Sequence, residues 1–391
     1  MKAFRHVRLW LGLLLVILLI CPTGNIRAAD NAAPTNRFPS VTPSKDLADA
    51  LPPAKWQQVE NSVDRALAWL AAHQADDGSF PTLSTAQPAV TSFCVLAFLS
   101  RGHQPGPGPY GRQMERAIDF VLSCQKEDGL LCFDTPGPSW QFEMASHTAS
   151  YNHAIAGLML GEVYGQVSGK RAKAVRVAME KALQFTRNLQ ARPKDPADQG
   201  SWGYLRPTSF SVDGDLSVTA WHLMFLRSAR NAEFKVPKQY ADEAVEYIRR
   251  AWDPAQSMFR YNRNGGSSRG LTGAGILSLS MAGQHQSAMA LAAGDWLLAH
   301  PFHQFGEQIG EFDRYYYSMF YCSQAAAQLG GRYWKGIYPA LAESILTTQL
   351  PDGSCPTEPN RGDVVFGQCY STSLAVLALT PAYQLLPVYQ R

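Results

Sequence analysis

The sequence predicts an all-α fold built from repeated pairs of helices. A short phrase recurs along the 391-residue chain, at Gln74–Phe80, Gln125–Leu130, Gln199–Tyr204 and Gln349–Ser354. An amphipathic run precedes each copy and a more apolar run follows it. A unit of about fifty residues with two helices cannot bury its own apolar face, so neighbouring units must pack side by side.

The phrase itself has a structural function. Its glycine, such as Gly78 after Asp77, ends a helix because glycine adopts the left-handed conformation at little cost. The aromatic residue that follows, such as Phe80, is expected to pack between helices. The glutamine amide can bond carbonyls freed at the helix end or a neighbouring loop. We therefore interpret these residues as structural rather than catalytic.

Six helix pairs follow from this pattern. They span residues 56–102, 113–165, 174–230, 239–284, 287–330 and 336–381. In the fourth and fifth pairs the phrase is degenerate and is replaced by Trp252–Phe259 and His300–Phe305. The second run of each pair is apolar nearly all round, as in residues 270–279, which is typical of an inner helix between neighbours.

The phrase resembles the QW-type repeat of the prenyltransferase and squalene-cyclase superfamily. The resemblance covers about residues 55–385 and includes Tyr151–Leu158, Asp215–Trp221 and Asp313–Tyr317. It implies an α/α toroid, a closed ring of about six helical hairpins with inner and outer layers around a central cavity. The chain is similar to an exported, bacterial-type member with a single toroid, and the loops before the inner helices would gather at one mouth of the cavity.

The N-terminus predicts export to the periplasm or the extracellular space. Three basic residues, Lys2, Arg5 and Arg8, precede an apolar stretch that is too short for a typical membrane span. We assign residues 1–28 to a signal peptide, with an uncleaved anchor as the alternative. Residues 29–50 then form a flexible tether, and residues 51–391 form the repeat domain. No stable membrane span is expected after cleavage.

The charge balance argues against nucleic acid as a partner. The chain has 35 Lys and Arg against 32 Asp and Glu, but four of the basic residues lie in the predicted signal peptide. The remainder is close to neutral, so neither nucleic acid nor an anionic membrane is expected as a partner. The sequence contains no cofactor motif, and we expect an apolar or oligomeric ligand of unknown identity.

The cysteines leave two alternatives open. Cys124 and Cys132 flank the loop of the second repeat, and Cys355 and Cys369 flank the loop of the sixth. An oxidising compartment would permit a disulfide in either loop, whereas the alternative is half-buried thiols. No C-x-x-C pair is present, so a zinc ribbon is not expected.

We expect site residues where the inner helices begin, because the loops before these helices would gather at one mouth of the cavity. Helix N-termini there favour negative charge, whether from a side chain or from a ligand. The candidates for ligand binding are His147, Tyr151, His153, Arg269, Asp313, Tyr316, Tyr317 and Tyr370. The candidates for catalysis are Asp213 and Asp215. His147 and His153 are six residues apart, which does not place both on one helical face, so they are not expected to hold a metal.

The resemblance suggests a role for Asp215. Squalene and class II diterpene cyclases use a D-x-D-D motif, whose middle Asp protonates an alkene or epoxide. The matching stretch is Asp213-Gly214-Asp215-Leu216, which keeps the first two acids and replaces the last. Asp215 would then be a general acid. The alternative is that Asp215 caps the following helix, assisted by Ser217 and Thr219.

A zinc site of the prenyltransferase type is not expected. Asp313 could match the family's aspartate, but Tyr315 stands where the cysteine is needed, and Gln368–Tyr370 where the histidine is expected. Two of the three ligands are therefore missing.

Two further classes of function remain open. In a polysaccharide hydrolase, Asp215 and Asp313 would form an acid and base pair across a polar groove. In a lyase, Tyr316 would act with Arg269. A non-catalytic interaction scaffold would instead have a plugged centre, whereas a cyclase would have an aromatic cavity with Asp215 buried beside it.

Overall fold

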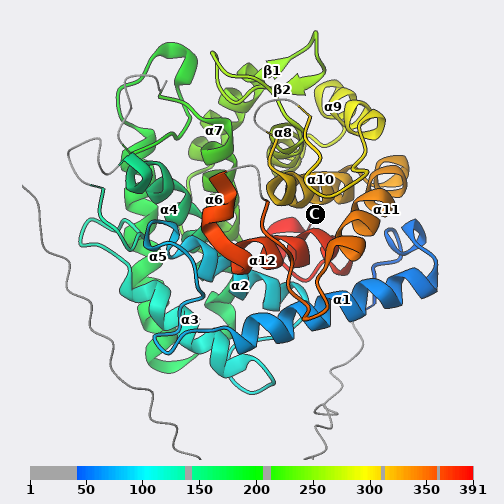
Figure 1. Ribbon diagram of the computed structural model, residues 1–391. Coiled ribbons are helices and arrows are strands. Elements are labelled where there is room, and N and C mark those ends of the chain that lie inside the picture. Colours follow the sequence, from blue (N-terminus) through cyan, green and yellow to red (C-terminus); the bar gives the residue numbers. More distant parts are fainter. Residues whose placement is uncertain (1–41, 137–142, 206–212, 310–312, 359–361, 391) are drawn as a thin grey trace, which may run out of the picture. The chain divides into compact units, whose positions relative to one another are not determined.

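The computed structural model describes residues 42–136, 143–205, 213–309, 313–358 and 362–390. These residues form twelve α-helices in two layers (Figure 1). The inner helices are α2 (Ala89–Ser100), α4 (Glu143–Val163), α6 (Leu216–Asn231), α8 (Arg269–Met281), α10 (Tyr315–Leu329) and α12 (Gly367–Leu379). The outer helices are α1 (Pro53–Ala72), α3 (Gly111–Ser123), α5 (Gly169–Gln190), α7 (Lys238–Arg250), α9 (Ala288–Ala299) and α11 (Gly331–Thr348). The six predicted pairs and the α/α toroid are therefore confirmed.

Short elements complete the described chain. Two strands, β1 (Trp252–Asp253) and β2 (Met258–Phe259), form a small antiparallel hairpin where the fourth phrase is degenerate. The short 3-10 helices are η1 (Ala48–Ala50), η2 (Ser84–Ala86), η4 (Tyr164–Gln166), η5 (Pro196–Asp198), η6 (Gly362–Phe366), η7 (Pro381–Tyr383) and η8 (Pro387–Tyr389).

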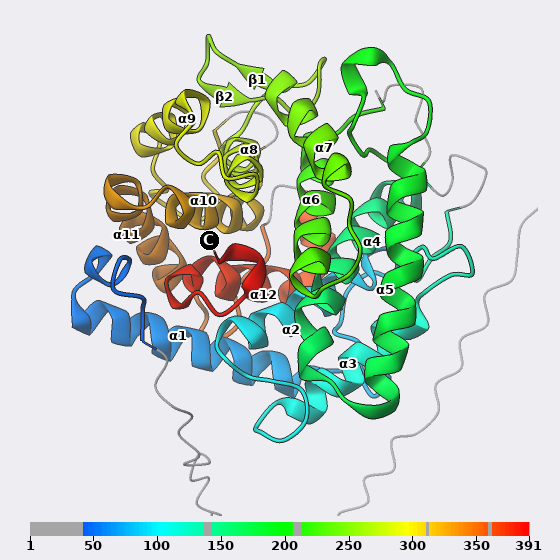
Figure 2. The same cartoon turned by 180° about the vertical axis from the view of Figure 1, so that it is seen from behind.

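The inner helices form a closed ring. Each contacts the next inner helix along the chain, and α12 contacts α2 and α1, so that the last pair packs against the first (Figure 2). Every residue of α2 is buried, as expected for an apolar helix enclosed by neighbours. The outer helix α1 buries one face only, which includes Val59, Val63, Leu67 and Leu70. The apolar and amphipathic runs of the sequence thus separate into the two layers.

The glutamine of each phrase connects adjacent repeats. Gln74 Nε2 donates to the Gly78 carbonyl (2.9 Å) and to a carbonyl of α3 (2.8 Å). Gln349 Nε2 donates likewise to the Gly353 carbonyl and to the Ser62 carbonyl in α1, both at 2.9 Å. The contact of Gln349 with α1 joins the sixth repeat to the first, which closes the ring.

In the third repeat, the glutamine that connects to the next repeat is Gln190 and not the predicted Gln199. Gln190, at the end of α5, makes the two equivalent bonds, to the carbonyls of Gly200 and Tyr240, both at 2.9 Å. Gln199 donates instead to the Lys194 carbonyl at 3.1 Å. The connecting loop is longer in this repeat, so the functional glutamine lies further from its glycine than in the other copies.

The phrase glycines pack tightly against the next outer helix, which predicts a large effect of substitution. Gly353 has φ +95°, and a Cβ there would lie 2.6 Å from the Arg65 carbonyl oxygen of α1. We expect Gly353→Ala to lower the free energy of unfolding by roughly 3 kcal/mol, through backbone strain and overpacking together. Gly283→Ala is the matched control, because Gly283 has φ +74° and open space around its Cβ position.

Gly283→Ala should lower the free energy of unfolding by only about 1 kcal/mol, which is the strain of the left-handed conformation alone. Urea-induced unfolding, followed by circular dichroism, measures both variants. Equal losses for the two variants would contradict the proposed close approach between repeats.

The predicted tether extends too far toward the domain. Leu47 is buried, and its carbonyl accepts a bond from Trp334 Nε1 (2.8 Å). The Ser44 amide also donates to the Ala382 carbonyl at 2.8 Å. Residues 44–50 thus belong to the packed domain because they cover apolar surface of α1 and α11. The predicted signal peptide, residues 1–28, lies outside the described residues.

The C-terminal segment covers one end of the ring. Asn231 Nδ2, at the end of α6, donates to the Pro387 carbonyl (3.0 Å). Gln328 Nε2, near the end of α10, donates to the Tyr389 carbonyl (2.6 Å). The segment therefore lies across the C-terminal ends of inner helices, near the centre of the ring in Figure 1. Any cavity accessible to a ligand must lie toward the opposite end.

The thiols of the described chain are reduced and buried. Cys94, Cys124, Cys132, Cys322, Cys355 and Cys369 are all free. Of the two alternatives left open by the sequence, the structure has the buried thiols.

No helix among the described residues is long and apolar enough to cross a membrane. Within the same residues, no cluster of three His, Cys, Asp or Glu side chains could hold a metal ion.

Candidate functional site

A cavity of about 430 Å³ lies at the N-terminal ends of the inner helices. All six inner helices contribute to its wall. Its aromatic lining residues are Phe93, Tyr151, Tyr204, Trp221, Tyr261, Tyr317, Phe366 and Tyr370. The other lining residues are Ala86, Ala89, Val90, His147, Thr148, Asn152, Ile155, Ser217, Leu271, Arg314 and Leu374. The volume lies within the range of roughly 300–1,000 Å³ that is usual for small-molecule sites.

Asp215 lies directly behind this wall. Its side chain is 3 % exposed and caps α6, because Oδ1 accepts a bond from the Val218 amide (3.0 Å). Oδ1 also accepts from Ser217 Oγ at 2.5 Å, and Ser217 Oγ lies 2.6 Å from the Tyr151 hydroxyl. Ser217 and Tyr151 both line the cavity, whereas Asp215 does not. The carboxyl is thus separated from the cavity by hydroxyl groups.

The environment of Asp215 favours its protonated form. Burial raises the pKa of the carboxyl, and hydrogen bonds from Ser217, Tyr261 and the Val218 amide offset this only in part. Tyr204 and Tyr261, whose hydroxyls bond each other, also interact with the carboxyl. Burial and the nearby Asp215 raise the pKa of both phenols, so they remain neutral hydrogen-bonding groups.

The cap predicted for α6 is present, and of the two residues expected to assist it, Ser217 bonds the Asp215 carboxyl and Thr219 does not. Thr219 does not assist Asp215, because its Oγ1 exchanges two bonds of 3.0 Å with the backbone of Trp202. The other predicted acid, Asp213, is half-buried, and its Oδ2 lies 3.4 Å from the Asp195 amide. Asp213 does not line the cavity. Of the two predicted catalytic acids, only Asp215 therefore lies beside it.

Four of the predicted ligand-binding residues do line the cavity, namely His147, Tyr151, Tyr317 and Tyr370. The His147 ring lies 4.2 Å from the Tyr204 ring, centroid to centroid. Tyr370 packs at 6.2 Å from Phe93, across the junction of α12 and α2. Tyr317 and Tyr370 come from the first turns of α10 and α12, and His147 and Tyr151 from the second and third turns of α4. All four therefore lie toward the N-terminal ends of inner helices, where polar residues were expected to gather.

His153 and Tyr316 have structural roles. His153 is fully buried, where its Nδ1 accepts from the Leu131 amide (3.1 Å) and its Nε2 lies 2.9 Å from Thr186 Oγ1. Burial lowers the pKa of His153 to about 3, so the ring is neutral near pH 7. Tyr316 is also buried and packs against Phe305 at 6.0 Å. Neither residue lines the cavity.

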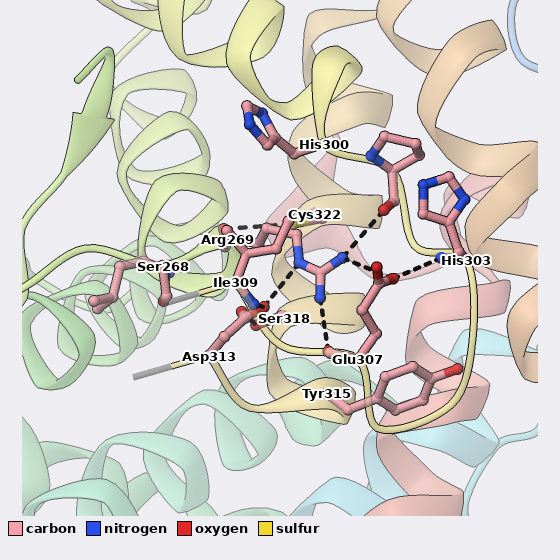
Figure 3. Close-up of polar contacts among 12 residues, drawn as sticks. Ser268, Arg269, His300, His303, Glu307, Ile309, Asp313, Tyr315, Ser318 and Cys322 are labelled. Atoms are coloured by element: carbon pink, nitrogen blue, oxygen red, sulfur yellow. Dashed lines mark hydrogen bonds and ion pairs between the residues drawn. The ribbon is translucent and has the colours of Figure 1, made fainter. Parts of the chain in front are cut away.

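Arg269 and Asp313 form a buried ion pair outside the cavity lining (Figure 3). Arg269 Nε donates to Asp313 Oδ2 at 2.8 Å, and both side chains are fully buried. The guanidinium also donates to the carbonyls of Pro301 (3.2 Å) and Glu307 (2.7 Å) and lies over the Phe302 ring. Arg269 thus connects the start of α8 to the loop of the fifth repeat.

The remaining oxygen of Asp313 is also occupied. Its Oδ1 accepts from Ser318 Oγ at 2.6 Å, and its Oδ2 accepts from the Ile309 amide at 2.9 Å as well as from Arg269. Three donors thus hold this carboxylate, which is fully buried and does not line the cavity. The predicted arrangement with Asp215 and Asp313 facing each other across a groove is therefore not formed, and Arg269 does not line the cavity either.

The sequence interpretation missed several lining residues. Trp221 is buried in the core and also forms part of the cavity wall, where it packs at 5.3 Å from both Phe93 and Phe320. Tyr204 ends the third phrase, and Tyr261 follows the β1–β2 hairpin of the fourth repeat, so the aromatic position at the end of each phrase was a usable signal. Arg314, directly before α10, was not among the candidate site residues, although Asp313 beside it was.

The chain matches no protein-family profile and no curated protein sequence. Its fold is similar to that of the type II terpene cyclase MstE from Scytonema, solved in complex with merosterolic acid A, with a TM-score of 0.54 and 16% identity. That match covers 86% of this chain and 100% of the cyclase. A family 76 glycoside hydrolase from a bovine Bacteroides thetaiotaomicron strain has a TM-score of 0.56 and 12% identity, over 83% of this chain and 77% of the hydrolase. At these identities the likeness shows the α/α-toroid fold alone.

Proposed function

We propose that the chain binds an apolar, isoprenoid-type ligand in the central cavity and protonates it with Asp215 as the general acid. This makes it a divergent terpenoid cyclase or isomerase. One observation carries the proposal: an aromatic cavity with a buried carboxyl behind a wall of hydroxyl groups. The likeness to MstE, which was also solved with geranylgeranyl dihydroxybenzoate, supports this class of ligand.

The aromatic wall suits a reaction through a carbocation. Protonation of a carbon–carbon double bond leaves positive charge on carbon, and the face of an aromatic ring attracts a cation by about 0.5–2 kcal/mol. Phe93 and Trp221 lie side by side in the wall, with ring centroids 5.3 Å apart. Of the described lining residues, none is a carboxylate that would trap such a cation as an ester.

Asp215 would supply the proton through its hydroxyl neighbours. Burial keeps the proton on the carboxyl to higher pH than in an exposed aspartate. The bonds from Asp215 to Ser217 and from Ser217 to Tyr151 provide a continuous path to the cavity. In the capping arrangement Ser217 donates to Oδ1, so the Ser217 hydroxyl must first turn to accept from the protonated carboxyl and donate to Tyr151. The carboxyl proton then moves to Ser217, the Ser217 proton moves to Tyr151, and the Tyr151 proton reaches the ligand.

The missing third acid of the cyclase motif changes how the proton is held. Leu216 is fully buried and contributes no charge near Asp215. Desolvation and hydroxyl groups therefore replace a second carboxylate as the groups that set the pKa of Asp215. A carbohydrate-active role has less support, because Asp313, the second carboxylate it requires, is held in the ion pair with Arg269.

Ligand extraction from the purified protein tests the proposal. The full chain is isolated from its own cells, and native mass spectrometry with lipid and glycan extraction identifies what co-purifies. We expect an isoprenoid, and we expect Ile155→Trp, which fills the cavity, to lose it. Val177→Trp is the control, because Val177 is exposed on α5. An oligosaccharide, or an equal amount of ligand in Ile155→Trp, would overturn the proposal.

A further inference from the structure

The last residues of the described chain form a plug in the end of the ring opposite the cavity mouth. Leu386, Val388 and Tyr389 are buried there, although the segment contains no element longer than the three residues of η8. The Tyr389 ring lies 6.4 Å from the Phe320 ring, which in turn stacks at 5.3 Å on Trp221 of the cavity wall. The plug is therefore two ring contacts away from the central cavity.

A buried carboxyl of α4 contacts this plug. Glu162 is 5% exposed, and its Oε2 accepts from the Val388 amide at 3.4 Å. Its Oε1 accepts from Ser228 Oγ of α6 at 2.6 Å. Both donors are uncharged, and a carboxylate that is buried without a cation is unfavourable. Burial accordingly raises the pKa of Glu162 to about 7, and the bonds from Ser228 and Val388 offset this only in part.

The surroundings of Glu162 supply no balancing charge in the described part of the chain. The titratable group that faces it from the plug is Tyr389, and burial and the Glu162 carboxyl raise the pKa of this phenol, so it remains neutral. From α6 comes the Ser228 hydroxyl, and from η4 the Gln166 amide donates to the Glu162 backbone carbonyl at 2.9 Å. Helices α2, α5 and η2 also pack against α4, but no charged group from them is among those that shift this pKa. The protonation of Glu162 therefore depends on whether water reaches the carboxyl.

The residue at which the plug begins is strained. Gln384 is exposed and has φ +51°, in the left-handed region that residues other than glycine rarely adopt. Its carbonyl accepts from Gln390 Nε2 at 2.7 Å, which closes the segment into a loop. Release of the plug would let Gln384 leave this conformation. Gln384 is thus placed as a hinge between η7 and the plug.

We propose that residues 384–390 are a releasable plug, which docks on the ring when Glu162 is protonated and leaves it when Glu162 is ionised. Release lets water solvate the carboxylate and uncovers Phe320 at the end of the ring opposite the mouth. The docked form binds the proton more tightly than the released form, so docking is strongest at low pH and weakens as the pH rises. This inference does not depend on the proposed function.

Hydrogen exchange followed by mass spectrometry measures docking in the full-length protein. In the docked plug the amides of residues 388–390 are all hydrogen-bonded. Between pH 4.5 and about 7, the ordinary and the raised pKa of Glu162, we expect their protection, corrected for the chemical exchange rate, to fall by up to about tenfold per pH unit. Above this interval it should change little. The amides of α2, which is fully buried, should stay protected throughout, which separates release from unfolding of the ring.

Glu162→Gln assigns the pH dependence to this carboxyl. Glutamine keeps the shape and an acceptor oxygen but has no charge, so the plug should stay protected at pH 8 and lose its pH dependence. Glu180→Gln is the matched control, because Glu180 lies exposed on α5, and this variant should retain the dependence. Gln384→Gly adopts positive φ without strain and should raise the protection about threefold at every pH.

The pH series of the unsubstituted protein is decisive by itself. Equal protection of residues 388–390 from pH 5 to pH 8 would overturn the proposal, whether or not Glu162→Gln folds. A pH dependence that persists in a folded Glu162→Gln variant would also overturn it, because another group would then control the plug. Loss of protection in α2 together with the plug would show that the ring unfolds instead of releasing its C-terminal segment.

Discussion

Replacing Arg269 with methionine is expected to lower the free energy of unfolding by about 3–5 kcal/mol, the cost of leaving one partner of a buried ion pair alone. Asp313 would keep its bonds from Ser318 and the Ile309 amide but lose the cation that balances its charge. The carbonyls of the fifth-repeat loop that accept from Arg269 would also lose their donor. Methionine fills a similar volume, so the loss reports the charge rather than a cavity.

A second pair in the protein provides the control. Arg260 and Asp253 form an ion pair at 2.7 Å in the fourth repeat, but the Arg260 side chain is 47% exposed. Arg260→Met should therefore cost no more than about 1 kcal/mol, the usual value of a solvent-exposed pair. Urea-induced unfolding of the two variants compares a buried with an exposed pair in the same fold.

A double substitution tests whether the cost comes from the unpaired charge. Asp313→Asn in the Arg269→Met background removes the buried carboxylate, so the double variant should recover part of the lost stability. Binding of cavity ligands by Arg269→Met should remain close to that of the unsubstituted protein, because Arg269 does not line the cavity. A large loss of binding in a folded variant would contradict the structural role and favour a direct contact with ligand.

The helical architecture could be predicted from the sequence because local signals repeat. Gly78, Gly129, Gly200 and Gly353 each mark a loop with positive φ, and each lies close to the next outer helix. The apolar pattern then separates inner from outer helices. Both signals are local in sequence, so six helix pairs could be assigned even where the phrase is degenerate.

The candidate site could be predicted only in part. Position in the repeat indicated that residues such as Tyr151 and Asp313 belong to the N-terminal parts of inner helices, and the structure has Asp313 just before α10 and Tyr151 in the N-terminal half of α4. It did not indicate side-chain direction, which depends on partners distant in sequence. Asp313 pairs with Arg269, forty-four residues away, whereas Tyr151 meets Ser217 across two inner helices. The adjacent Arg314 lines the cavity although Asp313 does not.

The position of the C-terminal segment across one end of the ring could not be predicted for a similar reason. Residues 387–389 have no repeat pattern, and their contacts with Asn231 and Gln328 join distant parts of the chain. Only the folded ring brings these acceptors and donors together. The restriction of the cavity to one end is therefore a property of the tertiary structure.

Replacing Asp215 with asparagine is expected to slow ligand protonation by about 10²–10⁴-fold, the usual contribution of a general acid. Asparagine is also a good helix cap, so it should keep the bond from the Val218 amide and leave stability nearly unchanged. Asp215→Ala removes both the acid and the helix cap, so in addition to slowing protonation it should lower the free energy of unfolding by about 1 kcal/mol. The pair of variants separates the acid from the cap.

Protonation on carbon has a direct readout in heavy water. The purified protein is incubated with geranylgeraniol or geranylgeranoic acid in D2O, and mass spectrometry measures deuterium bound to carbon in the product. We expect incorporation with the unsubstituted protein and a strong loss with Asp215→Asn. Asp195→Asn is the matched control, because Asp195 caps η5 through the Ala197 amide (2.9 Å) and does not line the cavity.

The pH dependence gives the same assignment a second test. Burial raises the folded-state pKa of Asp215 above its value in the unfolded chain, so the folded protein retains this proton to higher pH. The rate should be highest below the folded-state pKa and fall as the pH rises through it. The stability contributed by the bound proton should fall over the interval between the unfolded and folded pKa values. Asp215→Asn should lack both changes, whereas deuterium incorporation by this variant at the original rate would show that another group is the acid.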